Sequence, residues 1–262
     1  LTISGDSTVN VTGLQGDVRA SQSTGFIDIT TVTAADLAVD TGAGSMDITS
    51  ASGDVVVDAS SMSSSETLAL DGAANFDVSG AGTNITIDGD SGGDTLTGTL
   101  DVTMQDDATG VTMVTGSAAS SLNTGAGSAA SATVDADKLA NNTLLTLTGA
   151  AAVVGTGLIG DVNAAGLSGD LTLTTADNTD DNGIDITIGS ANTTLTGTGT
   201  DDTVTVDAGG ETGNTLNITG DSIFDVSNLA QALDANATGL GALAGTLTAT
   251  TVDLSDGAAL DI

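Results

Sequence analysis

The sequence predicts an all-β fold, a β-solenoid of the β-helix or β-roll type in which short strands stack coil upon coil. Three observations lead to this prediction. Apolar and small polar residues alternate in short runs, the runs recur about every nine to eleven residues, and the whole pattern repeats in units of about 70 residues. Alternation with a period of two marks a strand with one buried face. Many short, evenly spaced strands are typical of a solenoid.

The alternating runs are separated by turn-forming residues. Clear runs lie at residues 8–12 (TVNVT), 26–29 (FIDI), 54–57 (DVVV) and 202–206 (DTVTV), with clusters of Gly, Asp, Asn and Ser between such runs. These clusters predict tight turns. Of the 35 acidic residues, two (Glu66 and Glu211) are Glu and the other 33 are Asp, whose short carboxylate can bond to nearby backbone in a turn. One short helix is expected near residues 228–233.

The repeat is visible without gaps over the start of each unit. Four segments begin alike at Leu1, Leu68, Leu145 and Leu216, which lie 67, 77 and 71 residues apart. The same alignment superimposes two further sets of positions, Gly5, Gly72, Gly149 and Gly220, and Val9, Phe76, Val153 and Phe224. Residues 169–186 align likewise with residues 245–262, and a Val-Asp-Ala triplet closes the units at residues 57–59, 134–136 and 206–208.

We therefore expect one continuous solenoid of four units, 1–67, 68–144, 145–215 and a truncated 216–262. Because the fourth unit ends before its own triplet, the natural chain is expected to continue past Ile262. A narrow core of Val, Ile, Leu and Ala suits this architecture, with Phe76 and Phe224 as local plugs of the stack. The alternative is a string of tandem Ig-like β-sandwiches, which usually carry aromatic residues and turn prolines and need longer units.

The charge of the chain excludes several classes of partner. The net charge is −33, with Arg19 and Lys138 as the two basic residues and with no Trp or Tyr. Nucleic-acid binding needs basic patches and usually aromatic platforms, so no nucleic acid is expected. No run of about 18 apolar residues appears, so no membrane insertion is expected. Because self-repulsion opposes a compact state, we expect cations to assist folding.

Candidate cation ligands lie first in residues 89–96 (GDSGGDTL). Glycines there permit a tight turn, and the carboxylates of Asp90 and Asp94 supply the oxygen ligands that Ca²⁺ prefers. The segment resembles the glycine-aspartate nonapeptide of the RTX, or haemolysin-type, calcium-binding family, G-G-x-G-x-D-x-U-x with U a large aliphatic residue. Asp90 stands where that pattern has its second Gly.

Weaker candidates lie toward the C-terminus. Residues 197–204 and 209–216 echo the same nonapeptide with several positions replaced, and residues 178–185 follow the start of a calcium loop but have Gly189 where its bidentate Glu belongs. The further candidate ligands are Asn178, Asp180, Asn182, Asp185, Asp201, Asp202 and Asp207. Ordinary solvated turns are the competing interpretation at each of these positions.

Over its whole length the chain resembles the large repetitive surface proteins of bacteria, the RTX-type adhesins and crystalline S-layer proteins. The resemblance implies an extracellular, cell-surface location, export without a classical signal, and folding on binding calcium outside the cell. It also implies self-association into a lattice or filament, with a cell-surface glycan as a further candidate partner. The function expected is therefore structural.

Two other function classes are weighed against this expectation. A β-helical polysaccharide lyase needs a basic or phenolic proton acceptor, and the chain has no His and no Tyr. A glycosidase needs only two carboxylates, but no pair stands out among 33 Asp, so we expect no enzyme. A glycan- or ice-binding solenoid is suggested by the threonines in residues 193–200, although Thr is also a common outward-facing strand residue.

Overall fold

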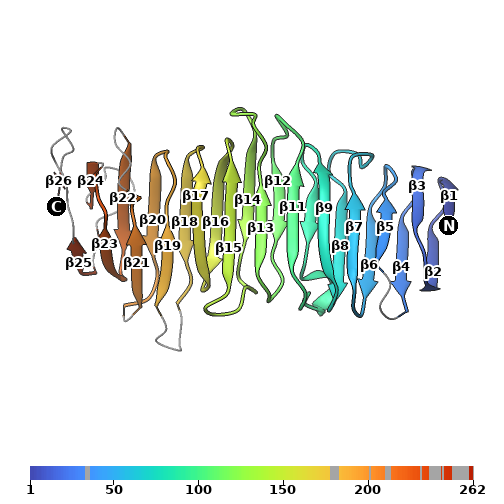
Figure 1. The fold of residues 1–262 in the computed structure, drawn as a ribbon, viewed down its shortest axis with the longest axis horizontal. Helices are drawn as coiled ribbons and strands as arrows, with labels where there is room; N and C mark the ends of the chain where they lie inside the picture. The colour runs from blue at the N-terminus through green and yellow to red at the C-terminus, as the bar shows by residue number, and fades with distance from the viewer. Residues whose placement is uncertain are drawn as a thin grey trace.

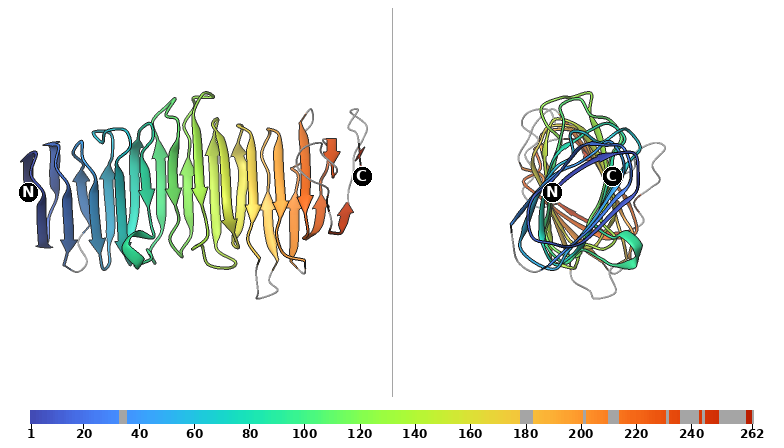
Figure 2. Two further views of the ribbon diagram at one scale, coloured as in Figure 1. Left: turned by 180° about the vertical axis from the view of Figure 1, so that it is seen from behind. Right: turned by 90° about the vertical axis from the view of Figure 1, so that its right-hand side faces the viewer.

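The chain folds as a β-solenoid, as the sequence predicts. The computed structural model describes residues 1–32, 36–177, 183–200, 202–209, 214–230, 232–235, 243, 245–249 and 260–261. Successive strands alternate between two sheets on opposite sides of the stack, and the coils follow one another along a single axis (Figure 1). Viewed along that axis, the coils superimpose as a flattened ring (Figure 2). The strands pair in parallel, which excludes the alternative of antiparallel Ig-like sandwiches.

The first sheet contains the odd-numbered strands and is called the odd sheet below. Its 13 described strands lie in sequence order, so each pairs with the strand two positions along the chain. They are β1 (Thr2–Gly5), β3 (Val18–Ser23), β5 (Leu37–Asp40), β7 (Asp54–Asp58), β9 (Asn75–Ala81), β11 (Leu100–Met104), β13 (Ser120–Asn123), β15 (Leu144–Gly149), β17 (Asp161–Leu167), β19 (Ile184–Thr187), β21 (Thr203–Asp207), β23 (Ile223–Ser227) and β25 (Leu247–Ala249).

The second sheet, the even sheet, has the same order and number of described strands. They are β2 (Val9–Leu14), β4 (Ile27–Thr31), β6 (Met46–Ser50), β8 (Thr67–Gly72), β10 (Thr86–Asp88), β12 (Val111–Val114), β14 (Ser131–Asp135), β16 (Ala152–Leu158), β18 (Leu171–Thr175), β20 (Thr193–Gly197), β22 (Thr215–Gly220), β24 (Ala232–Asp234) and β26 (Leu260–Asp261). One strand of each sheet and the two turns that join them make one coil.

The core lies between the two sheets and is built from rows of inward-facing apolar side chains. In the even sheet Ile27, Met46, Leu68 and Ile87 occupy one register row, and all four are fully buried. In the odd sheet Val55 and Phe76 pair in register, and both are buried. The prediction that Phe76 and Phe224 fill the stack is confirmed, since both lie in odd-sheet strands and are almost fully buried.

The sequence repeat corresponds to seven strands. The four aligned unit starts lie at β1, β8, β15 and β22, and the aligned glycines end these strands with similar positive φ angles. The angles are 100° at Gly5, 102° at Gly72, 105° at Gly149 and 98° at Gly220. Glycine adopts such angles without steric cost. Because seven is odd and a coil has two strands, successive units begin on opposite sheets.

A second repeated glycine marks the close contact between coils. Gly25, Gly98, Gly169 and Gly245 precede the fourth strand of their units, and a Cβ on any of them would collide with a backbone carbonyl of the preceding coil. The carbonyls belong to Ser7, Ala74, Ala151 and Ser222, the seventh residues of the four units. The repeated glycine is therefore required by the spacing of stacked corners.

The expected helix near residues 228–233 is wrong. Asn228 adopts a positive φ of 54° after β23, which turns the chain, and Ala232–Asp234 form strand β24. Leu229 and Leu233 are both buried, so their spacing reflects one inward position just after the turn at Asn228 and one inward position in β24. Within the described ranges the helical element is the 3-10 turn η1 (Ser91–Gly93), and no helix there is long and apolar enough to cross a bilayer.

Candidate cation-binding cluster

The turn at residues 89–96 folds over the even sheet next to β8. It is closed by a hydrogen bond from the Leu96 N–H to the Gly89 carbonyl, at 2.8 Å, and the Leu96 side chain is fully buried. Inside this loop the Asp94 N–H donates to the Ser91 carbonyl at 3.1 Å to end η1. The apolar position of the nonapeptide-like segment thus anchors the turn in the core, while Asp94 stays exposed.

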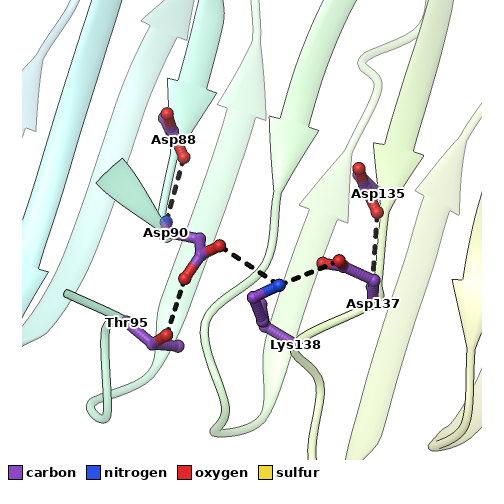
Figure 3. A network of polar contacts seen from close by, with 6 residues as sticks. All are labelled: Asp88, Asp90, Thr95, Asp135, Asp137 and Lys138. Atoms are coloured by element: carbon purple, nitrogen blue, oxygen red, sulfur yellow. Dashed lines mark hydrogen bonds and ion pairs between the residues drawn. The ribbon is translucent and has the colours of Figure 1, made fainter. Parts of the chain in front are cut away.

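Asp90, a predicted metal ligand, has other partners in the structure (Figure 3). Its Oδ1 accepts a hydrogen bond from the Thr95 hydroxyl at 2.6 Å, and its Oδ2 lies 3.4 Å from Nζ of Lys138. The same ammonium lies 2.9 Å from Oδ2 of Asp137. Both carboxylates raise the pKa of Lys138, and Asp137 has the larger effect. One of the two basic residues of the chain therefore joins the turn after β10 to the turn after β14.

Several aspartates serve as turn residues. Asp58, Asp135 and Asp207, the aspartates of the three Val-Asp-Ala triplets, each accept a hydrogen bond from the backbone N–H two residues ahead, at 2.9, 3.3 and 3.0 Å. Asp88 does the same for the N–H of Asp90 at 2.9 Å. This is the Asx-turn role that favours Asp over Glu. Asp207, predicted as a metal ligand, also accepts from the Asn228 side chain at 2.9 Å.

Asp71 is the carboxylate that sequence reasoning missed. It lies near the end of β8, only 8% of its surface is exposed, and its Oδ1 has no hydrogen-bond partner in the described part of the chain. Burial is the largest cause that raises the pKa of Asp71 to about 6, and the neighbouring charges of Asp47, Asp94, Asp88 and Asp90 contribute to the same rise in that order. Uncompensated burial disfavours the charged form of a carboxylate.

The sequence contained one signal for Asp71. At the fourth position of the repeat the other units have Ser4, Thr148 and Thr219, so an acid appears there only in the second unit. Alternation alone places this position at a strand end and predicts nothing unusual. Burial arises because the 89–97 segment crosses β8, as the hydrogen bond from Thr97 N–H to the Gly72 carbonyl at 2.8 Å shows.

Asp71 and Asp94 line one surface hollow. Its volume is about 420 Å³. The remaining lining residues are small or carry hydroxyls, namely Thr49, Ala51, Gly72, Ala73, Thr95 and Thr97. Asp47 lies on the neighbouring strand β6, and its pKa is raised by burial and then by Asp28. The hollow therefore combines oxygen donors with a strongly negative local field.

The C-terminal candidates are only partly described. Asn178, Asp180, Asn182 and Asp201 lie outside the described residues. Asp202 precedes β21 and is 3% exposed. A Cβ on Gly199 would collide with its carboxylate and would lie 3.4 Å from Oδ1 of Asp177, so two carboxylates flank this glycine. Asp185 lies on the exposed face of β19, where its N–H donates to Asp161 at 3.0 Å.

Among the described side chains, no three acidic groups converge as one metal ion with three carboxylate ligands would require. The chain matches no protein-family model, no curated protein and no solved structure at a significant level.

Proposed function

We propose that this chain is a structural segment of an extracellular surface protein, such as an S-layer, a surface filament or an adhesin, that folds and assembles with calcium. No catalytic role is included. The observation that carries the proposal is the placement of like charges on neighbouring strands. Asp28 pairs in register with Asp47 in the even sheet, and two further acidic pairs lie in the odd sheet. These are Asp40 with Asp58 and Asp77 with Asp101.

Such pairs oppose folding unless cations screen or bridge them. Adjacent strands are about 4.8 Å apart, and two unit charges about 5 Å apart repel by roughly 0.8 kcal/mol even in water. Like charges directly opposite each other in a sheet destabilise it. With a net charge of −33, the folded state gains from any ion that binds it and not the unfolded chain. Divalent ions outside the cell fit this requirement.

The test compares secondary structure and assembly with and without calcium. Circular dichroism in EDTA, in CaCl₂ and in NaCl of matched ionic strength should show a stronger β signal in calcium than in either control. Electron microscopy of the calcium sample should show sheets or filaments. An unchanged β signal in chelator would remove calcium from the proposal, and dispersed single particles at all concentrations would remove assembly.

A ligand-binding role is favoured by one observation. Thr172, Thr174, Thr194 and Thr196 form a grid on the outer face of β18 and β20. The Thr172 row spans two coils, because Val154 and Asn217 occupy its next positions, and the Thr174 row continues to Thr219, which is buried. This small area supports ice or glycan binding less well than the acidic rows support a structural role. Thermal hysteresis of the solution would favour ice binding instead.

A further inference from the structure

We propose that a divalent cation of the calcium type binds in the hollow between Asp71 and Asp94. This inference rests on the calcium component of the proposed function and assigns residues to it. Its basis is geometric: Asp71 is more than nine-tenths buried, its Oδ1 has no hydrogen-bond partner among the described residues, and it lines the hollow that Asp94 also lines. A buried polar atom without a partner points to a missing ion or water.

The donors around the hollow suit a hard cation. Asp71 and Asp94 provide two carboxylates, and Thr49, the register partner of Asp71 on β6, provides a hydroxyl. Ca²⁺ takes six to eight oxygen ligands at about 2.3–2.6 Å and accepts waters among them. With two carboxylates, the site would keep several waters. Its affinity should therefore resemble that of extracellular calcium modules, with a Kd of about 10⁻⁴–10⁻³ M.

Asp90 is not the ligand in this arrangement. Its two carboxylate oxygens contact the Thr95 hydroxyl and the Lys138 ammonium, and Asp88 bonds the backbone of the same turn. These contacts fix one side of the 89–97 segment. On its other side, Thr97 bonds the Gly72 carbonyl through both its N–H and its hydroxyl. A cation between Asp71 and Asp94 would join the segment to β8 at a further point.

The experiment counts bound calcium by isothermal titration calorimetry in about 0.15 M NaCl, which screens diffuse ion binding to exposed charges. The variants are Asp71→Asn and Asp94→Asn, with Asp6→Asn as the control. Asp6 is exposed in the turn after β1 and belongs to none of the in-register acidic pairs, so its variant changes the net charge equally without touching the hollow. We expect each hollow variant to lose one calcium equivalent and the control to lose none.

Europium luminescence supplies a second reading, by direct excitation because the chain has no Trp or Tyr to sensitise a lanthanide. The wild-type chain should show a bound ion that retains several waters, and the signal of this ion should disappear in Asp71→Asn. Equal stoichiometry and affinity in all four proteins would overturn the proposal. If Asp71→Asn fails to fold, Asp94→Asn decides, because Asp94 is exposed and its amide variant disturbs no core contact.

Failure of this site and failure of the proposed function are distinguishable. A wild-type chain that assembles in calcium while Asp71→Asn retains every calcium equivalent would reject the site and leave the structural role intact. A chain that binds calcium at Asp71 but neither assembles nor gains β structure would retain the site and reject the structural role.

Discussion

Replacing Asp71 by Asn should change the pH dependence of stability in the metal-free chain. The pKa of Asp71 is about 6 in the folded state, against an ordinary value of 3.8. A folded-state pKa above the unfolded one means that the native state holds a proton more tightly. The stabilisation is therefore complete below pH 3.8 and is lost as the pH rises through 6. At pH 8 the ionised Asp71 destabilises the fold.

The magnitude follows from the same two values. Each unit of difference between the folded and unfolded pKa values corresponds to about 1.4 kcal/mol. The upper limit of the destabilisation by ionised Asp71 is therefore about 3 kcal/mol. The hollow is open to solvent, which screens Asp71 from the charges of Asp47, Asp88, Asp90 and Asp94, so we expect roughly 1–2 kcal/mol. Lys138, bound to Asp90, offsets part of the repulsion. Asn keeps the shape of the side chain and removes the charge.

The assay is urea unfolding followed by circular dichroism between about pH 4 and pH 8 in EDTA, on wild type, Asp71→Asn and the control Asp6→Asn. Other carboxylates affect all three proteins, so the informative quantity is the difference from wild type in the free energy of unfolding. For Asp71→Asn this difference should grow by roughly 1–2 kcal/mol as the pH rises through 6. A difference that stays constant across this range would refute the assigned burial and repulsion.

Two further substitutions, each with a control variant, test the packing of the coils. Gly98→Ala places a Cβ against a carbonyl of the preceding coil and should cost about 1–3 kcal/mol. Gly16→Ala faces open space and should change stability by less than about 1 kcal/mol. Phe76→Ala removes a fully buried ring and should lower the free energy of unfolding by about 3–5 kcal/mol. Its control is Phe26→Ala, at a side chain that is 43% exposed, which should lower that free energy by about 1 kcal/mol or less. Urea unfolding measures all four, and equal losses within either pair would contradict the assigned contacts.

The fold was predictable because local pattern and global architecture agree. Alternation fixes which side chains face inward, and a turn cluster about every ten residues leaves few architectures except a solenoid. The seven-strand composition of the unit was harder to predict, because it requires each short turn to be assigned to one side of the stack. The region near Leu229 and Leu233 shows where residue spacing alone predicts the wrong element. Two buried leucines four residues apart look helical, but the first follows the positive φ of Asn228 that ends β23 and the second lies in strand β24.

The candidate site was less predictable because it depends on contacts distant in sequence. Residues 89–96 were identified from their glycines and aspartates, yet a lysine more than forty residues later, Lys138, binds Asp90. Asp71 has an unremarkable local sequence, and its burial comes from a segment more than twenty residues ahead. A sequence motif contains only residues that are close together in the chain. The electrostatic environment of a residue on a solenoid face, in contrast, is set by the coils above and below it.

An odd number of strands per unit determines what the molecule presents to its surroundings. Seven strands amount to three and a half coils, so each unit follows the last by a half turn about the axis and a shift of about 17 Å, at about 4.8 Å per coil. The triplet aspartates Asp58, Asp135 and Asp207 accordingly end strands of the odd, even and odd sheets. Both broad faces thus carry the repeated turn aspartates in alternation, an arrangement that the proposed assembly, with neighbours on two sides, would require. Asp71 breaks this equivalence, because Ser4, Thr148 and Thr219 occupy its position elsewhere, and a cation bound there would distinguish the second unit from the other three.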